Sequence, residues 1–143
     1  MAEMFGRDDI AIGIALPFGS GRSNFKLNYT TLDQAKTDLI SLLLTHKGER
    51  YMQPDFGTNL RRHIFSPNTE KLASTVKNEL IRDIRKWLPF LDIEDINVTR
   101  SVTNIDNYTI DVSITFRLVG GKDAFTEVTF VFNPDGGVAV QGI

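Results

Sequence analysis

The stretch YTIDVSITFRL, residues 108–118, alternates apolar and polar side chains from its first position to its last. Apolar residues recurring at every second position indicate a β-strand with one buried and one solvated face. Each buried side chain would contribute roughly 1.5–3 kcal/mol, so the apolar face as a whole is comparable with a domain's net stability of about 5–15 kcal/mol. Helices must therefore cover it. The six apolar residues are Tyr108, Ile110, Val112, Ile114, Phe116 and Leu118.

Further strands are indicated on both sides of this stretch. Residues 96–102 precede it across the turn-rich residues 103–107, and residues 124–132 follow it across Gly120, Gly121 and two polar residues. Three strands joined by short turns predict an antiparallel meander. After a turn at residues 133–137, Val138, Ala139 and Val140 form a candidate fourth strand. This strand could fold back on its own sheet or be taken up by a partner's sheet, and periodicity alone does not decide between the two.

Three helices are expected before the strands. The first begins at an N-cap on Thr31, with Gln34 in the capping-box position, and ends at His46 and Lys47 with Gly48 in the left-handed C′ conformation. A short helix spans about residues 59–65, and a third, amphipathic helix from Leu72 stops at Pro89. The predicted fold is α+β, a small antiparallel sheet of three to four strands with about three helices packed on one face.

Length and composition limit the function. The 143 residues are expected to form a single domain, with residues 1–29 as an N-terminal arm, 30–132 as the α+β core and 133–143 as a tail. The Gly- and Ser-containing residues 18–28 suggest that the arm is flexible or ordered by a partner. A net charge of −2 argues against nucleic-acid or membrane partners. The N-terminus is predicted to be neither a signal peptide nor a membrane span.

No residue pattern predicts catalysis. The densest acidic group, Asp92, Glu94 and Asp95, could in principle serve a glycosidase, but a solvated turn just past Pro89 is the simpler interpretation. The chain has no cysteine, and its two histidines lack a metal-binding spacing. We therefore expect no catalytic, cofactor or metal site, and no enzyme.

A basic patch, Arg61, Arg62 and His63, lies on the predicted short helix, with Arg50 nearby in sequence. A solvated helix face is its simplest interpretation. Neighbouring arginines could also grip a carboxylate of a partner in a forked geometry.

The segment THKGERYMQPDFGTNL, residues 45–60, reads as a rigid connector. Pro54 restricts the backbone, Gly57 permits a tight bend, and Tyr51, Met52 and Phe56 are expected to form an apolar underside. The segment also resembles the GPW/gene-product-25-like family, in which a helix ends in the pattern T-x-x-G-E-R-x-M-x-P-x-F-G-x-x-L. The matching residues are Thr45, Gly48, Glu49, Arg50, Met52, Pro54, Phe56, Gly57 and Leu60.

One part of this chain departs from the family pattern. Relatives tend to close the long helix with W-E-P-R, whereas this chain has Trp87, Leu88, Pro89 and Phe90. Two polar residues are thus replaced by apolar ones. Hydrophobic packing is therefore expected where the family makes a polar contact.

The resemblance implies a structural baseplate component of a contractile phage tail, located in the virion and, during assembly, in the host cytoplasm. It would link the baseplate wedge to the first ring of tail sheath and initiate sheath assembly by strand addition. The implied partners are the tail sheath protein, wedge proteins and further copies of this chain in a sixfold ring, with tail tube or hub proteins as an additional option. A non-viral contractile injection system is the alternative, and a peptidoglycan-cleaving, lysozyme-like hydrolase is a third hypothesis.

The residues predicted to contact partners come from three segments. Two are the connector and the corner after the long helix, and the third is the tail strand. They are Glu49, Arg50, Met52, Pro54, Phe56, Gly57, Pro89, Val138, Ala139 and Val140.

Overall fold

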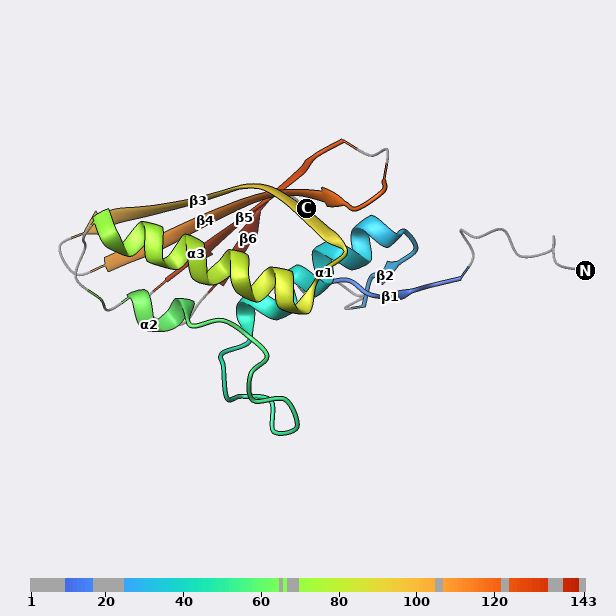
Figure 1. The fold of residues 1–143 in the computed structure, drawn as a ribbon, viewed down its shortest axis with the longest axis horizontal. Helices are drawn as coiled ribbons and strands as arrows, with labels where there is room; N and C mark the ends of the chain where they lie inside the picture. Colours follow the sequence, from blue (N-terminus) through green and yellow to red (C-terminus); the bar gives the residue numbers. More distant parts are fainter. Residues whose placement is uncertain are drawn as a thin grey trace, which may run out of the picture.

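A computed structural model describes residues 10–16, 25–64, 66, 70–104, 107–121, 124–133 and 138–141. Two short strands, β1 (Gly13–Ile14) and β2 (Leu27–Asn28), come first. Three helices follow, α1 (Thr31–Leu44), α2 (Leu60–Ile64) and α3 (Glu70–Trp87). The chain then forms β3 (Leu91–Asn104), β4 (Asn107–Leu118), β5 (Thr126–Phe132) and β6 (Val138–Gln141) (Figure 1).

The four long strands form one antiparallel meander in the order β3-β4-β5-β6. The tail strand β6 pairs with β5 of its own chain, with Val138 opposite Phe132 and Gln141 opposite Thr129. The structure therefore decides in favour of intramolecular pairing for residues 138–140. It also leaves β3 and β6 as the two edges of the sheet.

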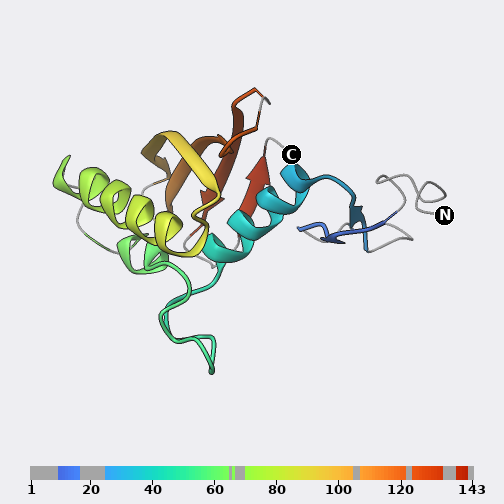
Figure 2. The same ribbon diagram turned by 45° about the vertical axis from the view of Figure 1, so that its right-hand side comes forward.

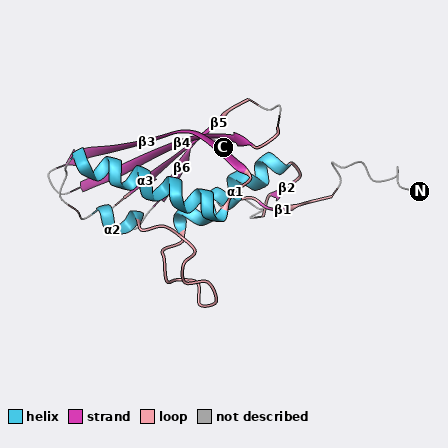
Figure 3. Cartoon of the chain, in the orientation of Figure 1, coloured by secondary structure: helices cyan, strands magenta, loops and turns pink. Residues whose placement is uncertain are grey.

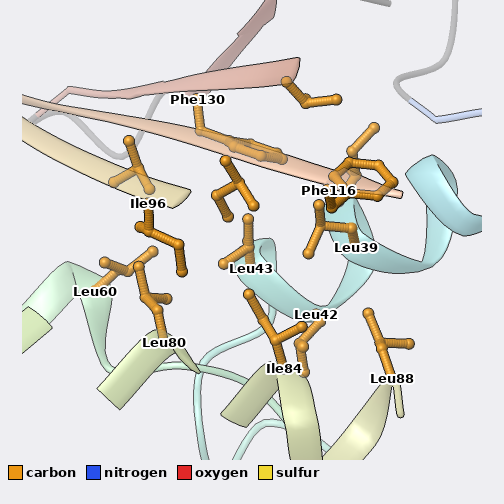
Figure 4. Close-up of a cluster of buried hydrophobic side chains, with 14 of the residues drawn as sticks. Leu39, Leu42, Leu43, Leu60, Leu80, Ile84, Leu88, Ile96, Phe116 and Phe130 are labelled. Carbon is orange, nitrogen blue, oxygen red and sulfur yellow. The ribbon is translucent and has the colours of Figure 1, made fainter. Parts of the chain in front are cut away.

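The helices lie together on one face of this sheet, which confirms the predicted α+β class (Figures 1 and 2). The apolar residues of β4 from Ile110 to Phe116 are all buried, as their alternation predicts. In Figure 4, Phe116, Phe130 and Ile96 from the sheet point toward leucines of α1 and α3. The core is thus a single layer of side chains between sheet and helices.

The first helix begins one residue earlier than predicted. Its N-cap is Thr30, whose hydroxyl oxygen accepts a hydrogen bond from the Asp33 N–H at 3.1 Å, so the predicted pairing of Thr31 with Gln34 is wrong. Gln34 instead bonds Asp38 through its amide nitrogen at 2.8 Å. Both Thr30 and Thr31 could act as the N-cap. Thr30 takes this role because its backbone has the extended conformation that an N-cap residue needs.

The end of α1 also differs from the prediction. The helix stops at Leu44 because Thr45 turns extended, and the Thr45 hydroxyl donates to the Ser41 carbonyl at 2.6 Å. His46 and Lys47 therefore lie outside the helix. Gly48 does have a positive φ of +95°, but it sits in a turn, where its N–H donates to the Pro54 carbonyl at 2.8 Å.

We expect Gly48→Val to destabilise the protein by about 1–2 kcal/mol, the cost of placing a side chain in the left-handed region. An added Cβ at Gly48 would meet nothing within 4 Å, so backbone strain alone should produce the loss. Urea unfolding of both proteins measures it. Gly48→Asn should lose less, because Asn tolerates positive φ, and equal losses for Val and Asn would contradict this explanation.

The predicted arm contains a structured element. Strands β1 and β2 pair antiparallel with each other, and the buried Asn28 donates to the Thr37 hydroxyl at 2.8 Å on α1. The sequence does not predict these two strands, because a strand of two residues is too short to show an alternating pattern. Residues 17–24, which hold most of the Gly- and Ser-containing segment, lie outside the described residues.

Candidate partner interface

Residues 45–58, called here the connector loop, leave the body of the protein between α1 and α2 and contain no helix or strand (Figures 1 and 3). Its two ends are tied to each other. The Thr58 N–H donates to the Thr45 carbonyl at 2.9 Å, and the Thr58 hydroxyl donates to the Leu43 carbonyl at 3.2 Å. The loop is therefore closed at its base and projects as a single finger.

Gly57 makes this closure possible. Its φ is +115°, and a Cβ at this position would meet the Thr45 carbonyl oxygen and lie 2.9 Å from the carbonyl carbon. Only glycine allows the backbone at the end of the loop to approach the backbone of Thr45 so closely at this φ. The sequence prediction of a tight bend at Gly57 is confirmed in this respect.

The tip of the connector loop carries two exposed apolar side chains. Tyr51 is 98% exposed and Met52 is 88% exposed, whereas Phe56 is buried at 8%. The expected apolar underside made by all three is therefore wrong, because only Phe56 faces the body. Two adjacent apolar side chains at a loop tip gain almost nothing from folding of the isolated protein, and a contiguous exposed apolar patch can mark an interaction site.

Aromatic and cationic side chains stiffen the loop from below. The Arg50 guanidinium lies 3.7 Å from the centroid of the Phe56 ring, and Phe56 packs edge-on against Trp87 at 5.2 Å between centroids. Lys86 lies 5.1 Å from the Trp87 ring. The loop is thus joined to the last turn of α3, immediately before Pro89.

Glu49 and Arg50 are both used within the loop. The Glu49 carboxylate accepts the His46 N–H at 2.9 Å, and Arg50 donates to the Gln53 side chain at 3.3 Å. Below them, Lys47 forms an ion pair at 2.8 Å with Asp83, which is 3% exposed. Together these contacts hold the backbone that presents Tyr51 and Met52.

Pro89 lies at an apolar corner. Leu88 is buried in the core, Pro89 is exposed, and Phe90 is 41% exposed at the edge of an open groove of about 590 Å³. The rest of the groove is lined by the start of α1 and the end of β4, namely Thr30, Thr31, Leu32, Leu118, Val119, Gly120 and Gly121. The departure at Leu88 and Phe90 is visible in the sequence, but the groove is not, because its two walls, residues 30–32 and 118–121, lie far apart along the chain.

The third predicted segment, β6, lies at the sheet edge. Val138 and Val140 are half-buried against the core, and Ala139 is exposed on the opposite face. The start of β6 also reaches the base of the connector loop, because Val138 lines one cavity together with Thr45 and Thr58. The fold therefore brings the connector loop and β6 together. The third segment, at Pro89, follows Trp87, whose ring packs against Phe56 of the loop.

The acidic cluster does not resemble a catalytic pair. Its residues lie within β3 rather than in a solvated turn, since the strand begins at Leu91. Asp92 pairs with Arg117 at 3.0 Å and Asp95 with Lys77 at 2.8 Å. The hydrogen bond from Lys77 holds the pKa of Asp95 below its usual value, whereas a catalytic acid needs a raised pKa.

The basic patch on α2 lies largely at the surface. His63 faces Glu79 at 3.0 Å, and Arg61 and Arg62 are exposed. Within the described ranges, no three His, Asp or Glu side chains gather as a metal site would require. None of the helices in this part of the chain is both long and apolar enough to span a membrane.

Comparison with known proteins decides the family. The sequence profile of GPW_gp25, described as baseplate wedge protein gp25, matches residues 31–122, which run from α1 through the connector loop to the end of β4. The chain belongs to this family. Its membership places the protein among baseplate components.

Individual relatives agree with this assignment. The baseplate wedge protein gp25 of Enterobacteria phage T4 is 29% identical over 97 residues, which cover 68% of this chain and 71% of the phage protein. A chain in the postcontracted baseplate of pyocin R2 is 25% identical, with a TM-score of 0.55, and the match covers 70% of this chain and 96% of that one.

A third solved structure shares the fold. It is a Geobacter sulfurreducens protein named only provisionally as a tail lysozyme, with a TM-score of 0.60 and 20% identity over 72% of this chain and 90% of its own. At that identity the likeness concerns the fold alone.

Proposed function

We propose that this protein is a structural, non-enzymatic link between the baseplate wedge and the first ring of tail sheath, and that it initiates the sheath by accepting a strand at β6. The observation that carries the proposal is that no strand among the described residues pairs with the outer edge of β6. Family membership supports the baseplate location, and the ion pairs at Asp92 and Asp95 support a non-enzymatic role.

The edge strand lacks the features that normally prevent strand pairing. β6 spans Val138–Gln141 and contains neither a charged residue nor a proline. Soluble proteins usually protect sheet edges with lysine, proline or a covering segment, because unpaired N–H and C=O groups recruit other strands. An unprotected edge is what a sheath subunit would need in order to add a strand by main-chain hydrogen bonds.

We assign the contact with the wedge to a different part of the molecule. This part consists of the connector loop and the apolar corner at the end of α3. Glu49, Arg50, Pro54, Phe56 and Gly57 shape the connector loop. Met52, together with the neighbouring Tyr51, supplies its apolar tip, and Pro89 and Phe90 supply an apolar corner. Apolar side chains surrounded by polar ones are typical of interface hot spots.

The wider arrangement follows the family. The proposal includes one folded domain per chain, copies in a sixfold ring, contact with tube or hub proteins, assembly in the host cytoplasm and residence in the virion baseplate. A bacterial injection system built on the same plan is the alternative, and the likeness to the pyocin R2 baseplate keeps it open.

Two consecutive proline substitutions test strand addition. Neighbouring N–H groups of a strand point to opposite edges, so one of Ala139→Pro and Val140→Pro removes a hydrogen bond to β5 and the other removes an outward N–H. The variant that retains wild-type stability in urea unfolding should lose sheath growth on purified baseplates, measured by electron microscopy. Deleting residues 133–143 is a poorer test, because Val138 and Val140 pack on the core.

The substitution Ala139→Ser is the control, because it changes the same position and keeps the N–H. It should support normal sheath growth. If both proline variants support sheath growth at the wild-type rate, strand addition at β6 is wrong.

A further inference from the structure

Residues 10–15 and 25–29, called here the N-terminal strand pair, contain β1 and β2 and lie beside the start of α1, away from the connector loop (Figures 1 and 2). The two strands are antiparallel, and Ile14 lies opposite Leu27. Residues directly opposite each other point to the same face of a sheet, and successive residues of one strand alternate between its faces. The strand pair therefore presents two faces of different composition.

One face is fixed to the body of the protein by polar contacts. Gly13 and Asn28, which lie opposite each other, belong to this face. The buried Asn28 amide donates to the Thr37 hydroxyl at 2.8 Å and to the Gln34 side-chain oxygen at 3.1 Å. A Cβ at Gly13 would run into the Gln34 side chain, so this face lies directly against α1. The opposite face therefore points away from the helix.

The outward face carries only aliphatic and aromatic side chains, each between 42% and 62% exposed. They are Ile10, Ile12, Ile14, Phe25, Leu27 and Tyr29. The strand pair contains one charged residue, Lys26, which alternates to the other face. Leu16 follows at a bend and packs against the core, so it does not continue this face. The outward face is thus a contiguous apolar surface without a charged side chain of the strand pair.

The area of this face is close to what a weak dimer needs. About half of each side chain is exposed, which for six large side chains amounts to roughly 500–600 Å². The largest apolar patch of a typical monomer covers about 300–600 Å², and a standard interface buries about 800 Å² of each partner. Two such faces stacked on each other would bury roughly 1,000–1,200 Å² in total, at the lower end of the range for specific complexes. That area predicts a reversible dimer with a micromolar or weaker dissociation constant.

A second copy of the chain supplies a matching surface. The apolar faces of two sheets pack on each other about 10 Å apart, and the outward face is such a sheet face. A net charge of −2 gives only weak repulsion between two copies. A sheet of two strands is also marginally stable by itself, so a second layer on its outward face would stabilise it.

We infer that the free protein forms a dimer with a second copy of itself by stacking the outward faces of two N-terminal strand pairs. The contact is two-fold, since both copies use the same face. A contact of this kind closes on itself and cannot also join neighbours around a sixfold ring, so the dimer must separate before its copies enter the proposed ring. The inference involves neither β6 nor the connector loop and goes beyond the proposed function.

Sedimentation equilibrium of the full chain, from micromolar to millimolar concentration, should show a monomer–dimer equilibrium. The methyl NMR signals of Ile12, Ile14 and Leu27 should shift with concentration, while those of Val140 in β6 should not. Replacing Ile14 and Leu27 together by threonine should weaken dimerisation at least about tenfold, because the stacked faces would bury less apolar surface. Threonine favours strands, so thermal unfolding at micromolar concentration should change little.

Met52→Thr is the matched control, because it removes an exposed apolar side chain at the tip of the connector loop, and it should dimerise like the wild type. A wild-type protein that stays monomeric throughout would overturn the inference, and the outward face would then be left to a different protein. Dimerisation that the double substitution leaves unchanged would also overturn it. If the double variant unfolds, the wild-type methyl signals decide, and shifts at Val140 without shifts at Ile14 would contradict the inference. Each of these outcomes leaves strand addition to be decided by the proline variants.

Discussion

Replacing Tyr51 and Met52 together by serine should abolish incorporation into the baseplate without changing the stability of the isolated protein. Both side chains are almost fully exposed, at 98% and 88%, so folding gains almost nothing from them. Side chains that act as hot spots of an interface cost about 2 kcal/mol or more each when they are truncated, and tyrosine is enriched among them. The double substitution should therefore weaken wedge binding by at least about 100-fold.

Two measurements on the same variant separate binding from folding. Thermal unfolding should be unchanged, while co-purification with wedge proteins should be lost. The pair Tyr51→Phe and Met52→Leu keeps the apolar surface and should bind normally. Retention of wedge binding by the serine variant would show that the loop tip is not the contact, and a lowered Tm would show that the two side chains support the fold.

Replacing Gly57 by alanine should destabilise the protein by about 2–5 kcal/mol, through two effects that act together. The φ of +115° alone would cost about 1–2 kcal/mol for a residue with a Cβ. The Cβ would also run into the Thr45 carbonyl group, which is backbone and cannot rotate away, at a cost of about 1–3 kcal/mol. Relief of this contact would break the Thr58 to Thr45 hydrogen bond at the loop base.

Gly48→Ala is the matched control for this prediction. Gly48 also has a positive φ, at +95°, but an added Cβ there meets nothing within 4 Å. The difference between the two alanine variants in urea unfolding therefore measures the close approach at Gly57. Equal losses of stability in the two variants would mean that the positive φ accounts for the whole effect. The close approach of Gly57 to Thr45 would then contribute nothing.

Some features of the candidate interface can be predicted from the sequence, and others cannot. The pattern in residues 45–60 predicted a connector and its tight bend, because glycine and proline act on the local backbone. The direction of Tyr51 and Met52 was predicted wrongly, because a loop has no periodicity that separates its inner face from its outer one. Likewise, the groove beside Phe90 and the cavity beside Val138 are lined by residues far apart in sequence.

The sequence by itself determined the α+β class, the amphipathic α3, the meander and the family resemblance. Each of these follows from short-range periodicity, from local backbone preferences or from a contiguous motif. Only the tertiary structure decided that β6 pairs with β5, that α1 ends at Leu44, and that the connector loop stands out as a finger. Those features depend on contacts between distant segments, whose free energies compete with equally plausible local alternatives.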